Sequence, residues 1–389
     1  MNVKQIRMLL VVIVVSFAVT GCSKEAQDSI YQNTMISGMF GYDETYNDTG
    51  MMNSERGIVY FCDPETGYRA PICTKINCSH EPRSLTNISP DCDAYFSEMI
   101  NCTAIIGDTL YYMAIPDDKG LFIKEFCKAE KNGTNRKVIA SFDNVEGPTY
   151  MAYEQGFFIY AYHNQDDPSG IPLEKYKAGI ILVDLGTEEV KHIKLDEADH
   201  IQVGICSISD NYLYFHLTYR DGDAGYDYED LTDPDKQDMI KNSIKMELWR
   251  YDLDTGEKSL IPDPAGYGFR TMGYDHILYQ SDDLDGFMIK NIKDGTENFL
   301  LDNKAGSEGI CLFSDGIVFS ADNTFSFWEN GTDKKEKIGI YQDDWISIYC
   351  ITRKWVYGVI MNGEDSEHVC CPKDKFMKGD FEWKVIELG

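Results

Sequence analysis

A short phrase recurs along this chain of 389 residues: one or two turn-forming residues, then a run of aliphatic and aromatic residues. Its copies begin at Arg56, Gly107, Gln155, Asp210, Tyr274, Ser314 and Arg353. A spacing of roughly 40–60 residues is typical of solenoids, propellers and repeat arrays, in which one supersecondary unit stacks on the next. The repeat therefore constrains the architecture more than any other feature of the sequence.

A second polar turn, which contains glycine, follows most of the phrases. Its copies lie at residues 63–67, 131–134, 184–187, 252–256, 293–296 and 329–332. The Asn-Gly and Asp-Gly pairs in several of these turns supply the positive φ angles that tight hairpins need. Flanking runs such as residues 246–251 alternate or stay apolar, as strands do. Each repeat unit therefore offers two hairpins, or four antiparallel strands.

Four antiparallel strands per unit, repeated around an axis, are the plan of a β-propeller. Neighbouring units bury each other's faces, and closing the ring removes the exposed ends. We expect an all-β fold over residues 54–389 with seven four-stranded antiparallel blades, one for each phrase. Six blades are the alternative, if the first phrase is only a cap or shares a blade with residues 381–386. An open sandwich or two stacked domains is the rival architecture.

The N-terminus has the organisation of an export signal. Lys4 and Arg7 precede an apolar run over residues 8–19. A run of that length suits the core of a signal peptide and is short for a helix that spans a bilayer. We expect a signal peptide over residues 1–21, followed by a polar tether over residues 22–53.

Residues 19–22 read Val-Thr-Gly-Cys, which resembles the lipobox of bacterial lipoproteins. In that family the cysteine thiol receives a diacylglyceryl group, and the chain is cut just before it. The resemblance implies lipidation at Cys22, so that acyl chains anchor the protein at the outer face of the cytoplasmic membrane. The alternative is an ordinary secretory signal with a chance cysteine.

The chain is strongly acidic, with a formal net charge of -29. An acidic protein of this size repels the phosphate backbone, so nucleic acid is not an expected partner. Self-repulsion that keeps the protein soluble explains the charge without a cation-binding role.

The aromatic phrases and the turns of the Asp-x-x-Thr-Gly type resemble those of TolB-like and YWTD-like propellers. Together with the lipobox, they are similar to propeller lipoproteins of Gram-positive bacteria whose domain has no assigned function. The resemblance covers nearly the whole mature chain and implies a ring of blades held outside the cytoplasmic membrane. No copy of the phrase reads Tyr-Trp-Thr-Asp itself, so the likeness to receptor-type propellers is loose.

A cysteine-rich insertion over residues 73–102 interrupts the repeat after its first copy. The cysteines in and just before it are Cys62, Cys73, Cys78, Cys92 and Cys102. Outside the membrane, thiols oxidise, so disulfides among these five are the first interpretation, with a connectivity that the spacing does not reveal. Zinc is the second, because three thiols and an imidazole suit that ion; its ligands would be Cys73, Cys78, His80 and Cys92. Free or buried thiols are the third.

An acidic insertion over residues 221–245 interrupts the repeat again, with Tyr226 and Tyr228 among Asp and Glu. Clustered carboxylates are the ligands that Ca²⁺ takes, but the spacing does not match an EF-hand loop. A solvated loop is the first interpretation, and calcium the alternative.

The sequence contains no hydrolase elbow, no phosphate-binding loop and no His-Glu-x-x-His motif, so no catalytic residue is assigned. We expect a binding or scaffolding module for a peptide, a carbohydrate or an envelope protein. One alternative is a carbohydrate-active enzyme with paired carboxylates at the central opening, for which Asp282-Asp283 and Asp343-Asp344 are candidates. The other alternative is a subunit of an envelope assembly or sensor complex.

Overall fold

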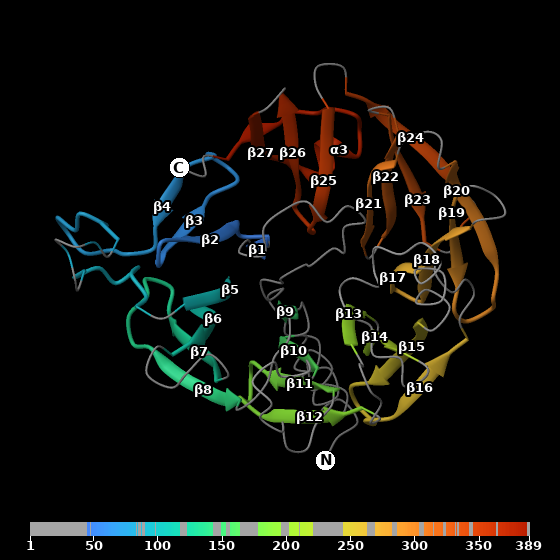
Figure 1. The fold of residues 1–389 in the computed structure, drawn as a ribbon. Helices are drawn as coiled ribbons and strands as arrows, with labels where there is room; N and C mark the ends of the chain where they lie inside the picture. Colours follow the sequence, from blue (N-terminus) through green and yellow to red (C-terminus); the bar gives the residue numbers. More distant parts are fainter. Residues whose placement is uncertain are drawn as a thin grey trace, which may run out of the picture.

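The computed structural model describes the chain in segments that together cover most of the repeat region. These segments are residues 45–46, 48–82, 84, 87, 90–97, 99–116, 123–142, 149–152, 156–163, 178–195, 202–209, 211–220, 244–262, 269–281, 286–302, 307–313, 315–321, 324–330, 332, 334–341, 345–362 and 365–386. Within them the chain forms seven four-stranded antiparallel sheets in consecutive order. The sheets stand as blades around a common centre (Figure 1).

The first four blades use the chain up to residue 261. Blade 1 contains β1 (Thr45–Tyr46), β2 (Met51–Glu55), β3 (Ile58–Cys62) and β4 (Arg69–Pro71). Blade 2 contains β5 (Met99–Ile106), β6 (Thr109–Ile115), β7 (Lys124–Glu130) and β8 (Lys137–Phe142). Blade 3 contains β9 (Thr149–Ala152), β10 (Phe157–His163), β11 (Ala178–Asp184) and β12 (Val190–Lys194). Blade 4 contains β13 (Gln202–Ser209), β14 (Tyr212–Arg220), β15 (Ile244–Asp252) and β16 (Lys258–Ile261).

The last three blades complete the ring. Blade 5 contains β17 (Phe269–Gly273), β18 (His276–Ser281), β19 (Gly286–Asn291) and β20 (Glu297–Asp302). Blade 6 contains β21 (Ser307–Phe313), β22 (Gly316–Ala321), β23 (Thr324–Glu329) and β24 (Lys335–Ile340). Blade 7 contains β25 (Trp345–Ile351), β26 (Trp355–Asn362), β27 (Asp365–Pro372) and β28 (Lys384–Val385), with the short helix α3 (Lys373–Phe376) between its last two strands.

One backbone hydrogen bond explains the recurring phrase. In blades 2 to 7, the first turn of the blade offers a carbonyl oxygen to an N–H group where the third strand ends. The pairs are Lys131 to Asp108, Leu185 to Gly156, Leu253 to Asn211, Ile292 to Asp275, Asn330 to Asp315 and Lys373 to Lys354, at 2.7 to 3.0 Å. Several of these acceptors have positive φ angles, which is why Gly, Asn and Asp precede the apolar run. The phrase is thus a hairpin turn tied to the neighbouring strand.

The core lies between blades, not within them. The described residues form seven buried apolar clusters, and each cluster joins two consecutive blades. The cluster that joins blade 7 to blade 1 includes Met51, Cys62 and Tyr357, each 0% exposed. The prediction of an all-β propeller with four-stranded antiparallel blades is therefore confirmed, and the ring is closed by side-chain packing.

The ends of the chain meet without sharing a blade. Residues 381–386 do not pair with the first sheet, since β28 forms the outer strand of blade 7 on β27. The shared-blade closure that the sequence left open is therefore wrong. Instead the buried carboxylate of Asp48 accepts the Arg353 Nε–H at 2.6 Å and the Lys354 backbone N–H at 3.1 Å. This contact fixes the start of blade 1 to the first turn of blade 7.

Candidate metal centre

Blade 1 has an outer edge made of two separate pieces of chain. Strand β4 covers only one half of β3, from Tyr60 to Cys62. The other half is covered by residues 94–96, which return from an excursion and bond to the β3 side through Val59 N–H to Ala94 O (2.9 Å) and Phe96 N–H to Gly57 O (2.8 Å). Residues 73–93 therefore form an excursion that leaves the edge of the blade and comes back to it. It projects from the rim of the ring beside β4 (Figure 1).

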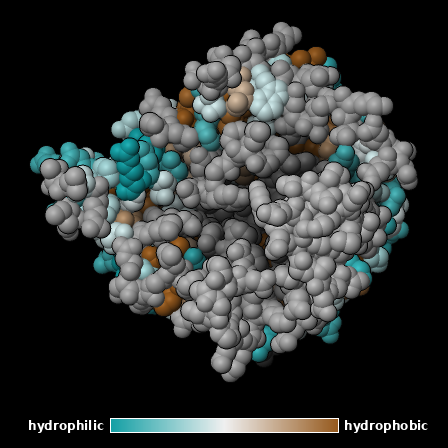
Figure 2. Space-filling view, in the orientation of Figure 1, coloured by the Kyte–Doolittle hydropathy of each residue, from teal (hydrophilic) through white to brown (hydrophobic). Residues whose placement is uncertain are grey.

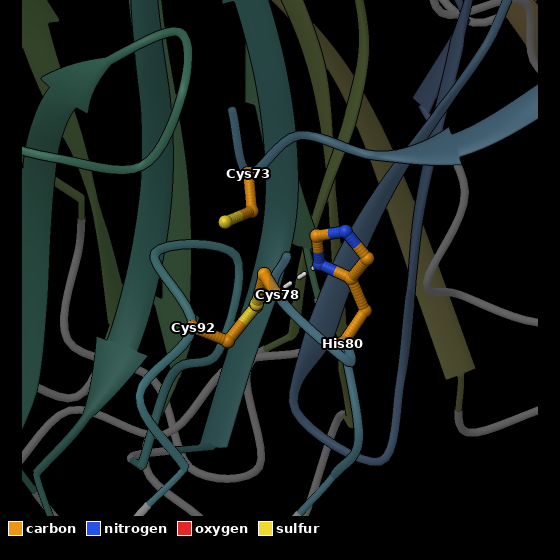
Figure 3. A group of neighbouring side chains, drawn as sticks. All are labelled: Cys73, Cys78, His80 and Cys92. Carbon is orange, nitrogen blue, oxygen red and sulfur yellow. Dashed lines mark hydrogen bonds between the residues drawn. The ribbon is translucent and has the colours of Figure 1, made fainter. Parts of the chain in front are cut away.

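Four metal-ligating side chains meet where the excursion begins and ends. The outgoing limb supplies Cys73, Cys78 and His80, and the return limb supplies Cys92. Their sulfur and nitrogen atoms all lie within 4.8 Å of one another, and the Cys92 Sγ lies 3.5 Å from the His80 Nδ1. Figure 3 shows the four side chains gathered at one place, with the His80 ring facing the Cys92 sulfur. The sequence-based metal hypothesis named these four residues, and the fold brings them together.

The outgoing limb takes its shape from tight turns and an ion pair. The Cys78 N–H donates to the Lys75 carbonyl at 3.4 Å, and Asn77 and His80 have φ angles of 63° and 52°. The Lys75 ammonium bridges to the return limb, with the Asp91 and Asp93 carboxylates at 2.6 and 2.9 Å. These two carboxylates flank Cys92, so the pairing holds that thiol opposite the outgoing limb.

The three thiols do not share the same electrostatic environment. Burial, together with the neighbouring thiols, raises the pKa of the Cys92 thiol to about 12. Burial also acts on Cys73, but hydrogen bonds from the Lys75 and Asp93 backbone N–H groups and from the other two thiols outweigh it and lower the pKa of Cys73. The cluster therefore stabilises one thiolate and resists further negative charge. A bound cation is what allows several crowded thiols to deprotonate together.

Besides the apolar packing of Ala94 and Phe96, an arginine docks the return limb on blade 2. The Arg136 guanidinium donates to the Asp93 and Tyr95 carbonyls, both at 2.8 Å, and its Nε donates to the Gly133 carbonyl at 2.9 Å. The guanidinium carbon also lies 3.7 Å from the centre of the Phe96 ring. Arg136 thus connects the chain on both sides of Ala94 to the β7–β8 turn, and through it the cluster to the second blade.

A glycine makes this approach possible. Gly133 has a φ of +84°, and a Cβ atom there would lie 2.0 Å from the Asp93 carbonyl oxygen. The Asn-Gly pair at residues 132–133 was predicted only to form a hairpin turn. The structure adds a second reason for the glycine, which is the close approach of the return limb.

Three thiols and one imidazole form a complete tetrahedral donor set, so the cluster could hold a metal ion. The ten cysteines whose side chains the structure describes form no disulfide. Three of these cysteines lie close enough here that a small movement would bring two sulfur atoms to bonding distance. The disulfide interpretation therefore stays a prediction, to be tested in solution.

The other predicted site residues are not in this cluster or lie outside the described residues. Cys62 is buried between blades 7 and 1, and Cys102 lies on β5 with a side chain outside the described set. Cys22, Asp282-Asp283, Asp343-Asp344 and acidic residues 221–243 are also outside it. Lipidation, calcium binding and a central carboxylate pair therefore stay predictions.

Four residues that complete the centre were missed from the sequence: Lys75, Asp91, Asp93 and Arg136. The Asp-Cys-Asp order at residues 91–93, together with a lysine between Cys73 and Cys78, could have predicted ion pairs between the two limbs. Arg136 carried none, because its contacts depend on how two blades pack. Within the described segments, no helix is long and apolar enough to cross a membrane.

Comparison with known proteins supports the fold and nothing finer. No family model matches the chain, and no curated protein matches it. Among solved structures, the propeller domain of the Trilobed protease from Pyrococcus furiosus, described as having an open velcro topology, matches with a TM-score of 0.50 and 10% identity, over 93% of this chain and 96% of that one. An acylaminoacyl peptidase of Pyrococcus horikoshii matches with a TM-score of 0.49 and 9% identity, over 92% of this chain and 52% of that one. This chain spans about half the length of that peptidase.

Apocarotenoid oxygenase from Synechocystis also matches, with a TM-score of 0.38 and 12% identity, over 91% of this chain and 72% of that one. At these identities the likeness concerns the fold alone.

Proposed function

We propose that this protein is a lipid-anchored binding propeller outside the cytoplasmic membrane, and that its Cys73–Cys78–His80–Cys92 cluster is a structural zinc centre. The observation that carries the proposal is the convergence of three thiols and an imidazole within 4.8 Å at the base of the excursion. Zinc favours this mixture of sulfur and nitrogen ligands in tetrahedral geometry. Four protein ligands leave no open position for substrate, so the proposed role is structural.

The excursion needs such a centre because its side chains bury little apolar surface. Residues 74–77 are exposed, and Ile76 is 91% exposed. Where the projection carries a colour in Figure 2, it is mostly hydrophilic. A loop that cannot build its own core depends on a covalent or metal cross-link to fix its base. Zinc would join Cys73 on the outgoing limb to Cys92 on the return limb and so close the loop.

Metal analysis of the purified protein tests the zinc centre. Full-length protein prepared with reductant and without chelator should contain about one zinc ion per chain. Cys92→Ser and His80→Ala should lose most of the zinc, because each removes a ligand. Cys311→Ser is the matched control: this thiol is buried between blades 6 and 7, away from the cluster, and should leave the zinc content unchanged. Zinc that persists in Cys92→Ser, or none in the parent protein, contradicts the centre.

The lipid anchor rests on the lipobox at residues 19–22. Mass spectrometry of the N-terminal peptide from the bacterial membrane fraction should find a chain that begins at Cys22 with a diacylglyceryl group. Cys22→Ser should move the protein out of the membrane fraction. An unmodified Cys22 in a released protein contradicts the anchor.

A binding or scaffolding role is supported by a closed ring of blades that offers a rigid surface, together with the lack of a catalytic motif in the sequence. The partner is an envelope protein, a peptide or a glycan. Pull-down with the delipidated propeller from envelope extracts should recover one specific partner at stoichiometric yield. Hydrolysis of a glycan panel by the purified protein would instead support the carbohydrate-active alternative.

A further inference from the structure

The three thiols of the centre are not equivalent in position. Cys73 and Cys78 belong to the same limb and are half-buried, whereas Cys92 belongs to the other limb and is 8% exposed. The Cys92 Sγ is also in contact with the His80 imidazole at 3.5 Å. An oxidant that arrives from solvent therefore meets the pair on the outgoing limb first.

We propose that the centre is a thiol–disulfide modification site, in which a low-molecular-weight disulfide converts Cys73 and Cys78 into an intramolecular disulfide and releases the metal. This inference rests on the proposed zinc centre. It makes the metal and the disulfide two states of one site: the metal-bound state of the reduced protein and the disulfide state of the oxidised one. An extracytoplasmic location is one where disulfides form and persist.

The position of the two cysteines favours their pairing with each other. They are separated by a short turn that the Cys78 N–H to Lys75 O hydrogen bond already closes. The entropic cost of ring closure is smallest for the shortest loop. A bridge from either thiol to Cys92 would instead close a longer loop, across the excursion to the return limb that Arg136 holds on blade 2.

The reaction balances through two exchange steps. The Cys73 thiolate attacks one sulfur of the small disulfide, forming a mixed disulfide and expelling one small thiolate. The Cys78 thiolate then attacks the Cys73 sulfur, forming the Cys73–Cys78 bond and expelling the second small thiolate. The protein loses two electrons, which reduce the small disulfide to two thiols. Zinc loses two of its four ligands and departs, and the Cys92 thiolate takes a proton from solvent.

The consequence is that oxidation opens the base of the excursion. Zinc links Cys73, Cys78 and His80 to Cys92 and so joins the two limbs, whereas a Cys73–Cys78 disulfide links the outgoing limb only to itself. Arg136 keeps the return limb on blade 2 in both states, since its acceptors are backbone carbonyls. The outgoing limb then keeps the ion pairs of the exposed Lys75 with Asp91 and Asp93 as a link to the return limb. Exposed ion pairs are weaker than a metal cross-link, so this limb opens more readily.

Treatment of the zinc-loaded, full-length protein with oxidised glutathione tests the inference. Zinc release is followed with a chromogenic chelator, free thiols are alkylated, and the disulfide is mapped by peptide mass spectrometry. We expect loss of the bound zinc, a Cys73–Cys78 bridge and an alkylated Cys92. Trypsin cleavage after Lys75 should become at least about tenfold faster, because the local opening costs less free energy.

A bridge that includes Cys92, or retention of zinc with all three thiols protected, overturns the inference. Cys78→Ser sharpens the test: oxidised glutathione should then leave a mixed disulfide on Cys73, while an internal bridge from Cys73 to Cys92 contradicts the proposed pairing. The two proposals fail separately. A purified protein that takes up no zinc contradicts the zinc centre, and the mapped disulfide still decides which thiols pair.

Discussion

Blade 1 is joined to its two neighbours by different means. At the joint with blade 7, Met51, Cys62 and Tyr357 pack in an apolar cluster, and the buried Asp48 carboxylate binds Arg353. The joint with blade 2 also has an apolar cluster. There, however, the chain runs out into the excursion, and its return limb is hydrogen-bonded to the Arg136 guanidinium. The first joint brings the two ends of the ring together without a shared strand. The second carries the cluster that we assign to zinc.

If the proposed zinc centre is correct, a repeat fold can secure one blade both by burial and by metal coordination. To bury the space between two blades, each blade needs apolar side chains on both of its faces. The recurring phrase supplies these side chains in each blade. The excursion interrupts that register, so polar ligands and backbone carbonyls are added there to the apolar packing of Cys92, Ala94 and Phe96. The stability of the joint with blade 7 should therefore not change with metal or redox state. The stability of the joint with blade 2 should depend on both.

The largest expected effect is at the joint with blade 7. Tyr357→Ala removes a fully buried ring and should lower the free energy of unfolding by about 3–5 kcal/mol, because it leaves a cavity between blades. Denaturant unfolding with and without a zinc chelator measures the loss. An equal loss under both conditions is expected, and a loss that disappears in chelator would contradict the independence of the two joints.

Metal removal at the joint with blade 2 should have the next largest effect. Chelation should lower the free energy of unfolding by about 3 kcal/mol, the magnitude expected when a loop of this length loses its cross-link. Hydrogen exchange should increase in the peptides that contain residues 73–82 and 90–96, and not in β25 to β27. Cys92→Ser should reproduce the change without chelator. Uniform exchange across all blades would show that the metal is not a local cross-link.

A pair of glycine substitutions isolates the docking of the return limb. Gly133→Ala and Gly295→Ala replace equivalent turn glycines with φ angles of +84° and +74°, but only at Gly133 would the added Cβ meet the Asp93 carbonyl. Gly295→Ala should cost about 1 kcal/mol for the positive φ alone. Gly133→Ala should cost about 1–2 kcal/mol more, measured by denaturant unfolding, because the limb must shift. Equal costs would mean that this contact contributes nothing.

The last expected effect is a dependence of zinc affinity on pH, which leaves the stability of the metal-free fold unchanged. The pKa of the Cys92 thiol is raised to about 12 in the metal-free protein, so between pH 5 and pH 8 that thiol is protonated until zinc displaces the proton. Zinc affinity should therefore rise with pH, by about tenfold per pH unit for each proton released. Competition with a chromophoric chelator at several pH values measures the slope. The stability difference caused by Tyr357→Ala should show no such slope, and a flat zinc affinity would contradict thiolate ligation.

The architecture was predictable because its signal is repeated. Each phrase carries a turn residue such as Gly107, Gly156 or Asn211 and an apolar strand, so seven weak signals support one another. The closure was not predictable in the same way. Residues 381–386 have the aromatic pattern of a strand, but the pattern does not say whether blade 1 or blade 7 receives them.

The ligands of the centre were predictable by residue type and not by position. Cys73, Cys78, His80 and Cys92 stood out as three thiols and an imidazole in one insertion. The metal hypothesis named these four and left out Cys62 and Cys102, but the sequence did not show that the four meet, because their meeting depends on residues 94–96 pairing with β3. Arg136 was invisible for the same reason, since its acceptors are carbonyl groups of a distant loop.

X-ray absorption at the zinc edge of the purified, reduced protein tests the central claim most directly. Stoichiometric zinc is expected, with three sulfur neighbours at about 2.3 Å and one nitrogen neighbour at about 2.0 Å. In Cys92→Ser the sulfur count should fall or the metal should be lost. Zinc bound only by oxygen and nitrogen, or a reduced protein that binds no zinc, would contradict the assignment of this cluster as the cross-link of blade 1.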